Sequence, residues 1–299
     1  MKSIINLVIN IKLIIHIGTH KTASTTFQAL CTRSQKVLMD NQILFPDYFK
    51  FPQNNDFQQH SGVAWMSQKR DLEGVSIFLQ KIYDDALKKK CTTTLISGED
   101  FENFLVEIHL AIEFEDLAKF IGFSEIEWLV VQRNPLDYLL SIYAEKSSYK
   151  MVLDIGIMAN SILEYGFFST SSPDYNYKFV FDIKKFSSFF KEGVKQNLKV
   201  VNFDNFIDDF VGKALFIDLV NNKSLNLLRK EARNLGIQRK RVSKEKIEFR
   251  YLANFLGMKS NKDFHENNKN LVDSLVNHRL NRNKTLLSEI EVKFKEYFN

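Results

Sequence analysis

The sequence predicts an α/β fold with three layers, in which a mainly parallel sheet is flanked by helices. Apolar runs typical of buried parallel strands recur along the 299 residues, and amphipathic helical segments separate them. Hydrophobic residues make up 44% of the chain, which is enough for a sizeable core. We expect one domain over residues 1–299, with helical or loop insertions around 40–90, 146–180 and 221–299.

The first predicted strand is the run IKLIIHI at residues 11–17, which leads directly into a turn and a helix. Gly18 permits the sharp turn. Small polar residues from Thr22 to Thr26 would leave free backbone N–H groups at the helix N-terminus, where an anion is favoured. This segment therefore predicts a phosphate-binding loop.

The elements expected after this loop alternate in type. In chain order they are a helix at 75–87, a strand at 92–97, a helix at 111–121 that ends at Gly122, a strand at 126–132, a helix at 135–146, a helix at 182–192 and a strand at 197–203. Right-handed crossovers would make the sheet parallel and gather ligands at the carboxyl ends of its strands. The weak periodicity of residues 146–180 and 221–270 predicts loops and short helices over a substrate cleft.

The lysine of the loop argues against a nucleoside triphosphatase. In the motif G-x-x-x-x-G-K-[ST], counting from Gly18 requires glycine at position 23 and lysine at position 24. The chain has Ala23 and Ser24 there, and its lysine is Lys21. A standard ATP or GTP site is therefore disfavoured.

The segment HKTASTT at residues 20–26 resembles the 5′-phosphosulfate loop of sulfotransferases that use 3′-phosphoadenosine 5′-phosphosulfate (PAPS), commonly K-[ST]-G-[ST]-T. The resemblance implies that Lys21 stabilises the charge on the leaving phosphate. It also implies that the donor is bound by Lys21, Thr22, Ala23, Ser24, Thr25 and Thr26. Ala23 stands where the family has glycine, so this residue must keep a negative φ or carry strain.

A second segment, RNPLDYLLSIY, follows the predicted strand at 126–132. It resembles the stretch of sulfotransferases in which an arginine and a serine bind the 3′-phosphate of the nucleotide, and the matching residues here are Arg133 and Ser141. A guanidinium is a planar fork of donors that suits a phosphate. The alternative is a surface arginine beside a helix start and a helical serine that faces solvent.

An acceptor hydroxyl also needs a general base, for which the sequence offers two candidates. Glu99 directly follows the strand at 92–97, where soluble members of the family keep a catalytic histidine. His60 lies in a stretch that resembles bacterial members with a histidine at this point, and it would be a base or a substrate-binding residue. Asp100 is a weaker candidate. Glu99 could instead be a helix N-terminal carboxylate, and His60 a surface residue.

The net charge and the two cysteines bear on the partners and the compartment of the protein. The formal charge of +5 suits an anionic donor or acceptor, but it is equally typical of a mildly basic surface. Cys31 and Cys91 have neither metal nor disulfide spacing, which indicates a reducing compartment. We expect no metal requirement, no nucleic-acid partner and no transmembrane segment. The chain resembles a cytoplasmic, bacterial member of the family.

The resemblance implies transfer of a sulfuryl group from PAPS to a hydroxyl, less readily an amine, of a carbohydrate or glycolipid, with release of adenosine 3′,5′-bisphosphate (PAP). Two alternatives are a P-loop kinase acting on a small molecule and a non-catalytic PAP-binding protein. The basic run Arg239, Lys240, Arg241, Val242 and Ser243 loosely resembles the C-terminal basic segment that closes the nucleotide site in sulfotransferases. A solvated basic face explains this run better.

Overall fold

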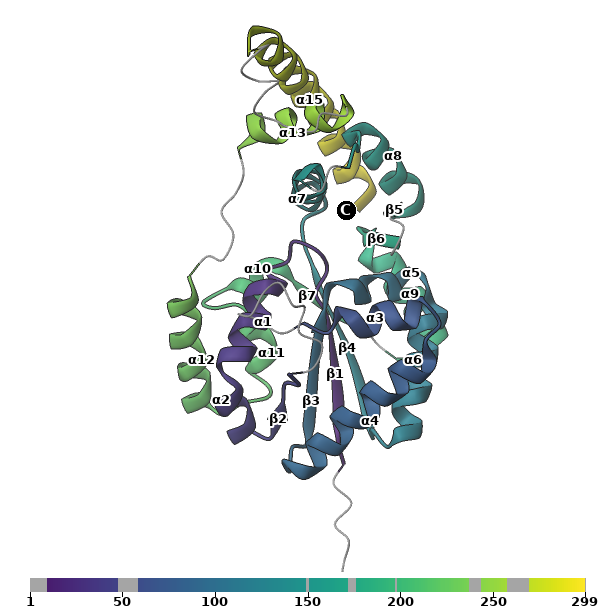
Figure 1. The fold of residues 1–299 in the computed structure, drawn as a ribbon, viewed down its shortest axis with the longest axis vertical. Coiled ribbons are helices and arrows are strands. Elements are labelled where there is room, and N and C mark those ends of the chain that lie inside the picture. Colours follow the sequence, from purple (N-terminus) through teal and green to yellow (C-terminus); the bar gives the residue numbers. More distant parts are fainter. Residues whose placement is uncertain are drawn as a thin grey trace, which may run out of the picture. The chain divides into compact units, whose positions relative to one another are not determined.

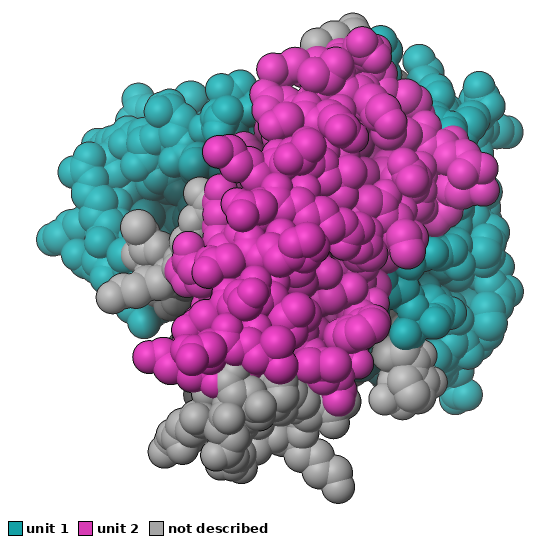
Figure 2. Space-filling view, turned by 90° about the horizontal axis from the view of Figure 1, so that it is seen from above, with its two compact units in different colours: residues 1–132, 169–238 teal, residues 133–168, 239–299 magenta. Residues whose placement is uncertain are grey.

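The computed structural model describes residues 10–47, 59–148, 151–171, 176–196, 198–236, 243–256 and 269–298. Two compact units make up the chain (Figure 2), and each is built from two separate segments. Unit 1 comprises Met1–Gln132 and Ser169–Gln238, and unit 2 comprises Arg133–Phe168 and Arg239–Asn299. That both units belong to one domain, as the sequence predicts, stays a prediction.

Unit 1 is built on a five-stranded sheet in which every pair of neighbouring strands is parallel (Figure 1). The strand order is β2-β3-β1-β4-β7. The strands are β1 (Lys12–Ile17), β2 (Ile43–Leu44), β3 (Thr93–Gly98), β4 (Glu125–Gln132) and β7 (Leu198–Asn202). The α/β class and the four predicted strands are confirmed, and the short edge strand β2 had no separate signal in the sequence.

Helices cover both faces of this sheet. Those of unit 1 are α1 (Ser24–Arg33), α2 (Gln35–Asp40), α3 (Ser61–Gln68), α4 (Leu72–Lys88), the 3₁₀ helix η1 (Glu99–Glu102), α5 (Asn103–Val106), α6 (Ile108–Ile121), α9 (Ile183–Val194), α10 (Phe203–Ile207), α11 (Lys213–Phe216) and α12 (Asn222–Leu235). On one face, Ile14 of β1 shares a core cluster with Phe27 of α1 and Leu228 of α12. On the other, Trp128 of β4 packs against Phe114 of α6 and Phe190 of α9.

The ranges 146–180 and 221–270 contain longer elements than the short helices expected there. Helix α12 has 14 residues, and β5 (Phe167–Ser171) pairs with β6 (Asn176–Val180) in a second, two-stranded sheet. The Asn221 side chain caps α12 by accepting a hydrogen bond from Ser224 N at 2.9 Å. Many polar residues in α12 conceal the apolar stripe that contains Leu225 and Leu228.

In the described part of unit 2 the helices are α7 (Pro135–Ser148), α8 (Ile155–Tyr165), α13 (Lys244–Phe255) and α15 (Lys269–Phe298). A buried carboxylate joins three of these helices. Glu248 of α13 accepts hydrogen bonds from Tyr143 of α7 at 3.0 Å and from Arg279 of α15 at 2.8 Å. Asn283 donates a further bond at 2.8 Å, and the Arg279 guanidinium lies 3.6 Å from the centre of the Tyr251 ring. A buried charge with several partners is tolerated, whereas loss of one partner is costly.

Candidate functional site

The predicted phosphate-binding loop joins β1 to α1 at the carboxyl edge of the sheet. Because β1 is the central strand, the loop lies beside the carboxyl ends of β3 and β4, and Ile17 pairs with Gly98 and with Val130. The Thr19 hydroxyl donates to the Val131 carbonyl at 2.7 Å, which fastens the loop to β4. The site therefore forms where open parallel sheets gather their ligands.

Gly18 is required by close packing at the start of this loop. A Cβ atom at this position would lie 2.4 Å from Ser24 Oγ, 2.9 Å from Ser24 Cβ and 3.1 Å from His16 Cε1. Both neighbouring side chains are buried. Any side chain at residue 18 would therefore push α1 away from β1.

The loop backbone presents a row of amides. Lys21 and Ala23 both have φ of 63°, in the left-handed region, and helical residues follow from Ser24. Within the described residues, no group accepts a hydrogen bond from the backbone N–H groups of residues 22–26. Alternating backbone conformation before a helix N-terminus produces a concave anion-binding nest. Of the two options at Ala23, the structure has the strained one, since its φ is positive.

The side chains of the loop divide into two groups. Thr22 and Ser24 are buried, and the Thr22 hydroxyl donates to the Thr19 carbonyl within the turn. Lys21, Thr25 and Thr26 are only partly buried. Direct ligand contacts from side chains are therefore expected from the second group, while Thr22 and Ser24 contribute their amides.

Glu99 lies beside the loop and is paired with a residue that the sequence analysis missed. Its carboxylate is 3.2 Å from Nδ1 of His20, and Glu99 is the first residue of η1 after β3. Burial alone would lower the pKa of His20, but the hydrogen bond and charge of Glu99, with the charges of Glu102 and Asp100, raise it to about 9. His20 is therefore an imidazolium at neutral pH.

Two more carboxylates lie on η1. Glu102 is fully buried and accepts hydrogen bonds from the backbone N–H of His20 at 3.2 Å and of Val180 at 2.6 Å. It therefore joins the loop to β6. Burial raises the pKa of Asp100 above its usual range, and the Asp100 amide donates to the Ser61 hydroxyl at 3.4 Å.

His60, the second candidate base, is fully buried at the start of α3. Its Nδ1 accepts from the Ser97 amide at 3.0 Å, and its Nε2 lies 3.1 Å from the Pro46 carbonyl, to which it donates. Burial lowers the pKa of His60 to about 4. Both ring nitrogens are thus committed to the backbone, and this arrangement favours a structural role over that of a base or of a surface residue.

A second buried histidine lies beneath the loop. His16 Nδ1 is 2.8 Å from the Ser97 hydroxyl, which also accepts from the Gln28 side chain at 3.2 Å. Burial lowers the pKa of His16 to about 3, and the ring stacks on Phe206. Its position within an apolar strand run was the one signal in the sequence for a buried, neutral histidine.

Arg133 and Ser141, the predicted 3′-phosphate ligands, belong to unit 2. Arg133 follows Gln132, the last residue of β4, and Asn134 caps α7 by accepting from the Leu136 amide at 3.0 Å. The predicted helix start is confirmed. The Ser141 hydroxyl donates to the Asp137 carbonyl at 2.8 Å, so it would have to rotate to donate to a phosphate. Arg239, Lys240, Arg241 and Val242 lie outside the described residues, and Ser243 caps α13.

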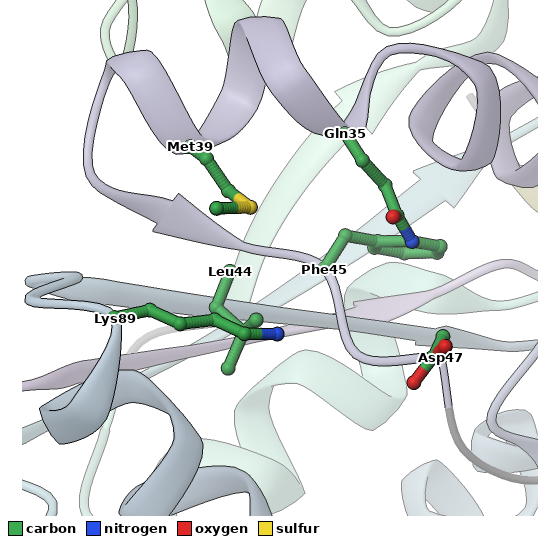
Figure 3. A pocket seen from close by; sticks show the side chains of 6 residues that line it. All are labelled: Gln35, Met39, Leu44, Phe45, Asp47 and Lys89. Carbon is green, nitrogen blue, oxygen red and sulfur yellow. The ribbon is translucent and has the colours of Figure 1, made fainter.

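A small pocket of about 50 Å³ lies elsewhere in unit 1 (Figure 3). It is lined by Gln35, Met39, Leu44, Phe45, Asp47 and Lys89. It contains none of the predicted site residues.

Three further properties concern the described part of the chain alone. There, no three His, Cys, Asp or Glu side chains are grouped so that they could hold a metal ion. None of the helices described combines the length and the apolar composition needed to span a bilayer. Cys31 and Cys91 are both buried, free thiols.

Comparison with known proteins adds no assignment: no protein-family model matches the chain, and a search of curated proteins finds no significant relative.

Proposed function

We propose that this protein is a PAPS-dependent sulfotransferase with the P-loop-like fold of that family. One observation carries the proposal: the strand, loop and helix at residues 12–33 present a row of amides that have no acceptor among the described residues, beside a lysine that precedes them. Backbone amides at a helix N-terminus bind phosphate and sulfate groups. The position of Lys21 and the segment from Arg133 favour a 3′-phosphorylated donor over ATP.

In this mechanism the amides of residues 22–26 bind the 5′-phosphate and the sulfate oxygens. The acceptor oxygen forms a new bond to sulfur while the bond from sulfur to the 5′-phosphate oxygen breaks, and the electron pair of that bond stays on the phosphate. Lys21 stabilises this growing negative charge. The proton of the acceptor hydroxyl passes to the carboxylate of Glu99. Arg133 and Ser141 hold the 3′-phosphate and contribute affinity rather than chemistry.

A carbohydrate or glycolipid hydroxyl is the proposed acceptor, and a cytoplasmic location is proposed with it. Both rest on the resemblance of the loop to that of bacterial sulfotransferases. No feature of the described residues favours a particular sugar.

The decisive experiment compares the affinity of the full chain for PAP and for ATP by calorimetry, and then assays transfer of labelled sulfate from PAPS to a panel of saccharides and glycolipids. Preferential binding of PAP together with transfer is the expected result. A preference for ATP would support the kinase alternative. PAP binding without transfer to any acceptor would support the non-catalytic binding protein.

A further inference from the structure

We propose that His20 supplies a positive charge that contacts the anionic donor at the loop, and that Glu99 holds this charge in place. This role rests on the proposed function, because the donor is the ligand that His20 would contact. His20 is then a further binding residue, and Glu99 has a positioning role through His20 in addition to any transfer of a proton.

The geometry fixes one edge of the imidazole and leaves the other available. Nδ1 lies 3.2 Å from the Glu99 carboxylate. Within the described part of the chain, Nε2 on the opposite edge makes no hydrogen bond, although the side chain is only 10% exposed. The ring also makes edge contacts with two aromatics of β6, 5.0 Å from the ring centre of Phe179 and 6.0 Å from that of Tyr177. A charged N–H donor is thus held rigidly within the loop itself.

The charges around the loop explain why a second cation is needed. The neighbouring η1 carries the carboxyl groups of Glu99, Asp100 and Glu102, and Glu102 reaches the backbone amide of His20. These groups would repel a phosphosulfate bound to the amides of residues 22–26. The imidazolium offsets part of this repulsion, whereas a neutral ring would not. The raised pKa of His20 agrees with this assignment. Burial opposes the increase, and the hydrogen bond and charge of Glu99 are its main cause.

The position of His20 in the sequence places its imidazole in the same loop as the proposed donor-binding amides. His20 precedes Lys21 directly, so two cationic side chains border the row of amides. The titratable groups that face His20 are Glu99, Asp100 and Glu102 of η1 and Tyr177 of β6. Among these, Glu99 alone contacts the ring at hydrogen-bond distance, and its removal is the sharpest way to change the charge of His20 without changing the ring.

The test is calorimetric titration of PAP into the full chain from pH 7 to 10 at constant ionic strength, for the unchanged protein and for H20Q, E99Q and H109Q. His109 is an exposed histidine of α6 and serves as the matched control. We expect H20Q to weaken PAP binding about tenfold or more at pH 7, as for loss of a charged hydrogen bond. The unchanged protein and H109Q should lose affinity as the pH rises through about 9, and H20Q should lack this step. In E99Q the step should move to lower pH.

The outcomes separate the two proposals. If the unchanged protein binds no PAP, the proposed function and the role of His20 are both overturned. If the unchanged protein binds PAP but H20Q binds it equally well with the same pH profile, only the role of His20 is overturned. Should H20Q fail to fold, an E99Q profile identical to that of the unchanged protein would equally overturn the proposal.

Discussion

Substitution of Gly18 by alanine should destabilise unit 1 by about 1–2 kcal/mol. The added methyl group would lie 2.4 Å from Ser24 Oγ, 2.9 Å from Ser24 Cβ and 3.1 Å from His16 Cε1. Ser24 is 1% exposed and His16 is fully buried, so neither can move into solvent. Overpacking of this kind costs about 1–3 kcal/mol. The reduced freedom of the unfolded chain recovers about 0.4–1 kcal/mol.

Tryptophan fluorescence during urea denaturation is a suitable assay, because Trp65 and Trp128 are the two tryptophans of the chain and both belong to unit 1. With a urea dependence of about 2–3 kcal/mol/M, the midpoint should fall by about 0.5 M. The control is S24A, which removes the closest atom. In the double variant the two effects should couple by about 0.5 kcal/mol or more, because S24A relieves part of the clash. An unchanged midpoint for G18A, or strict additivity with S24A, would refute the packing argument.

Three other predictions follow from the site. K21A should abolish sulfate transfer while the fluorescence and the urea midpoint stay unchanged, since Lys21 is partly exposed and lies outside the core; residual turnover near that of the unchanged protein would contradict its role. R133A should raise the Kd for PAP about tenfold or more, as measured by calorimetry, and an equal Kd would remove Arg133 from the site. Acidification from pH 6 to 5 should reduce the free energy of unfolding of unit 1 by about 2 kcal/mol. His16 and His60 have folded-state pKa values of about 3 and about 4, so they stay neutral in the fold but bind protons when unfolded; a flat urea midpoint over this range would count against the buried, neutral assignment.

Local sequence patterns were sufficient to predict the elements that form the loop. The apolar run before Gly18 gave β1, and the small polar residues after it gave the free amides at the start of α1. The conformation of Ala23 was left open between two alternatives, because a single alanine does not reveal whether its neighbours force a positive φ. In the structure both Lys21 and Ala23 have φ of 63°.

Local sequence patterns could not predict contacts between residues that lie far apart in the chain. His20 and Glu99 meet because β1 and β3 are adjacent and in register, with Ile17 opposite Gly98. The neighbour of a strand cannot be read from the strand itself. His60 was predicted as a base or a substrate-binding residue from a resemblance and from the chemistry of imidazole, neither of which reveals that the backbone of Ser97 contacts both its amide and its Nδ1. The division into two units likewise depends on helices far apart in the chain.

The buried carboxylate of Glu248 has a consequence for the order in which this polypeptide matures on the ribosome. All five strands of the parallel sheet have been synthesised once Asn202 is made. Helix α7 is translated before then, yet its Tyr143 has to wait for α13 and α15 to supply Glu248 and Arg279. Unit 1 can therefore complete its sheet during translation, whereas unit 2 closes last. A ribosome stalled before residue 269 would carry Glu248 without its cationic partner, and such a nascent chain should be recognised by chaperones through its incomplete helical half.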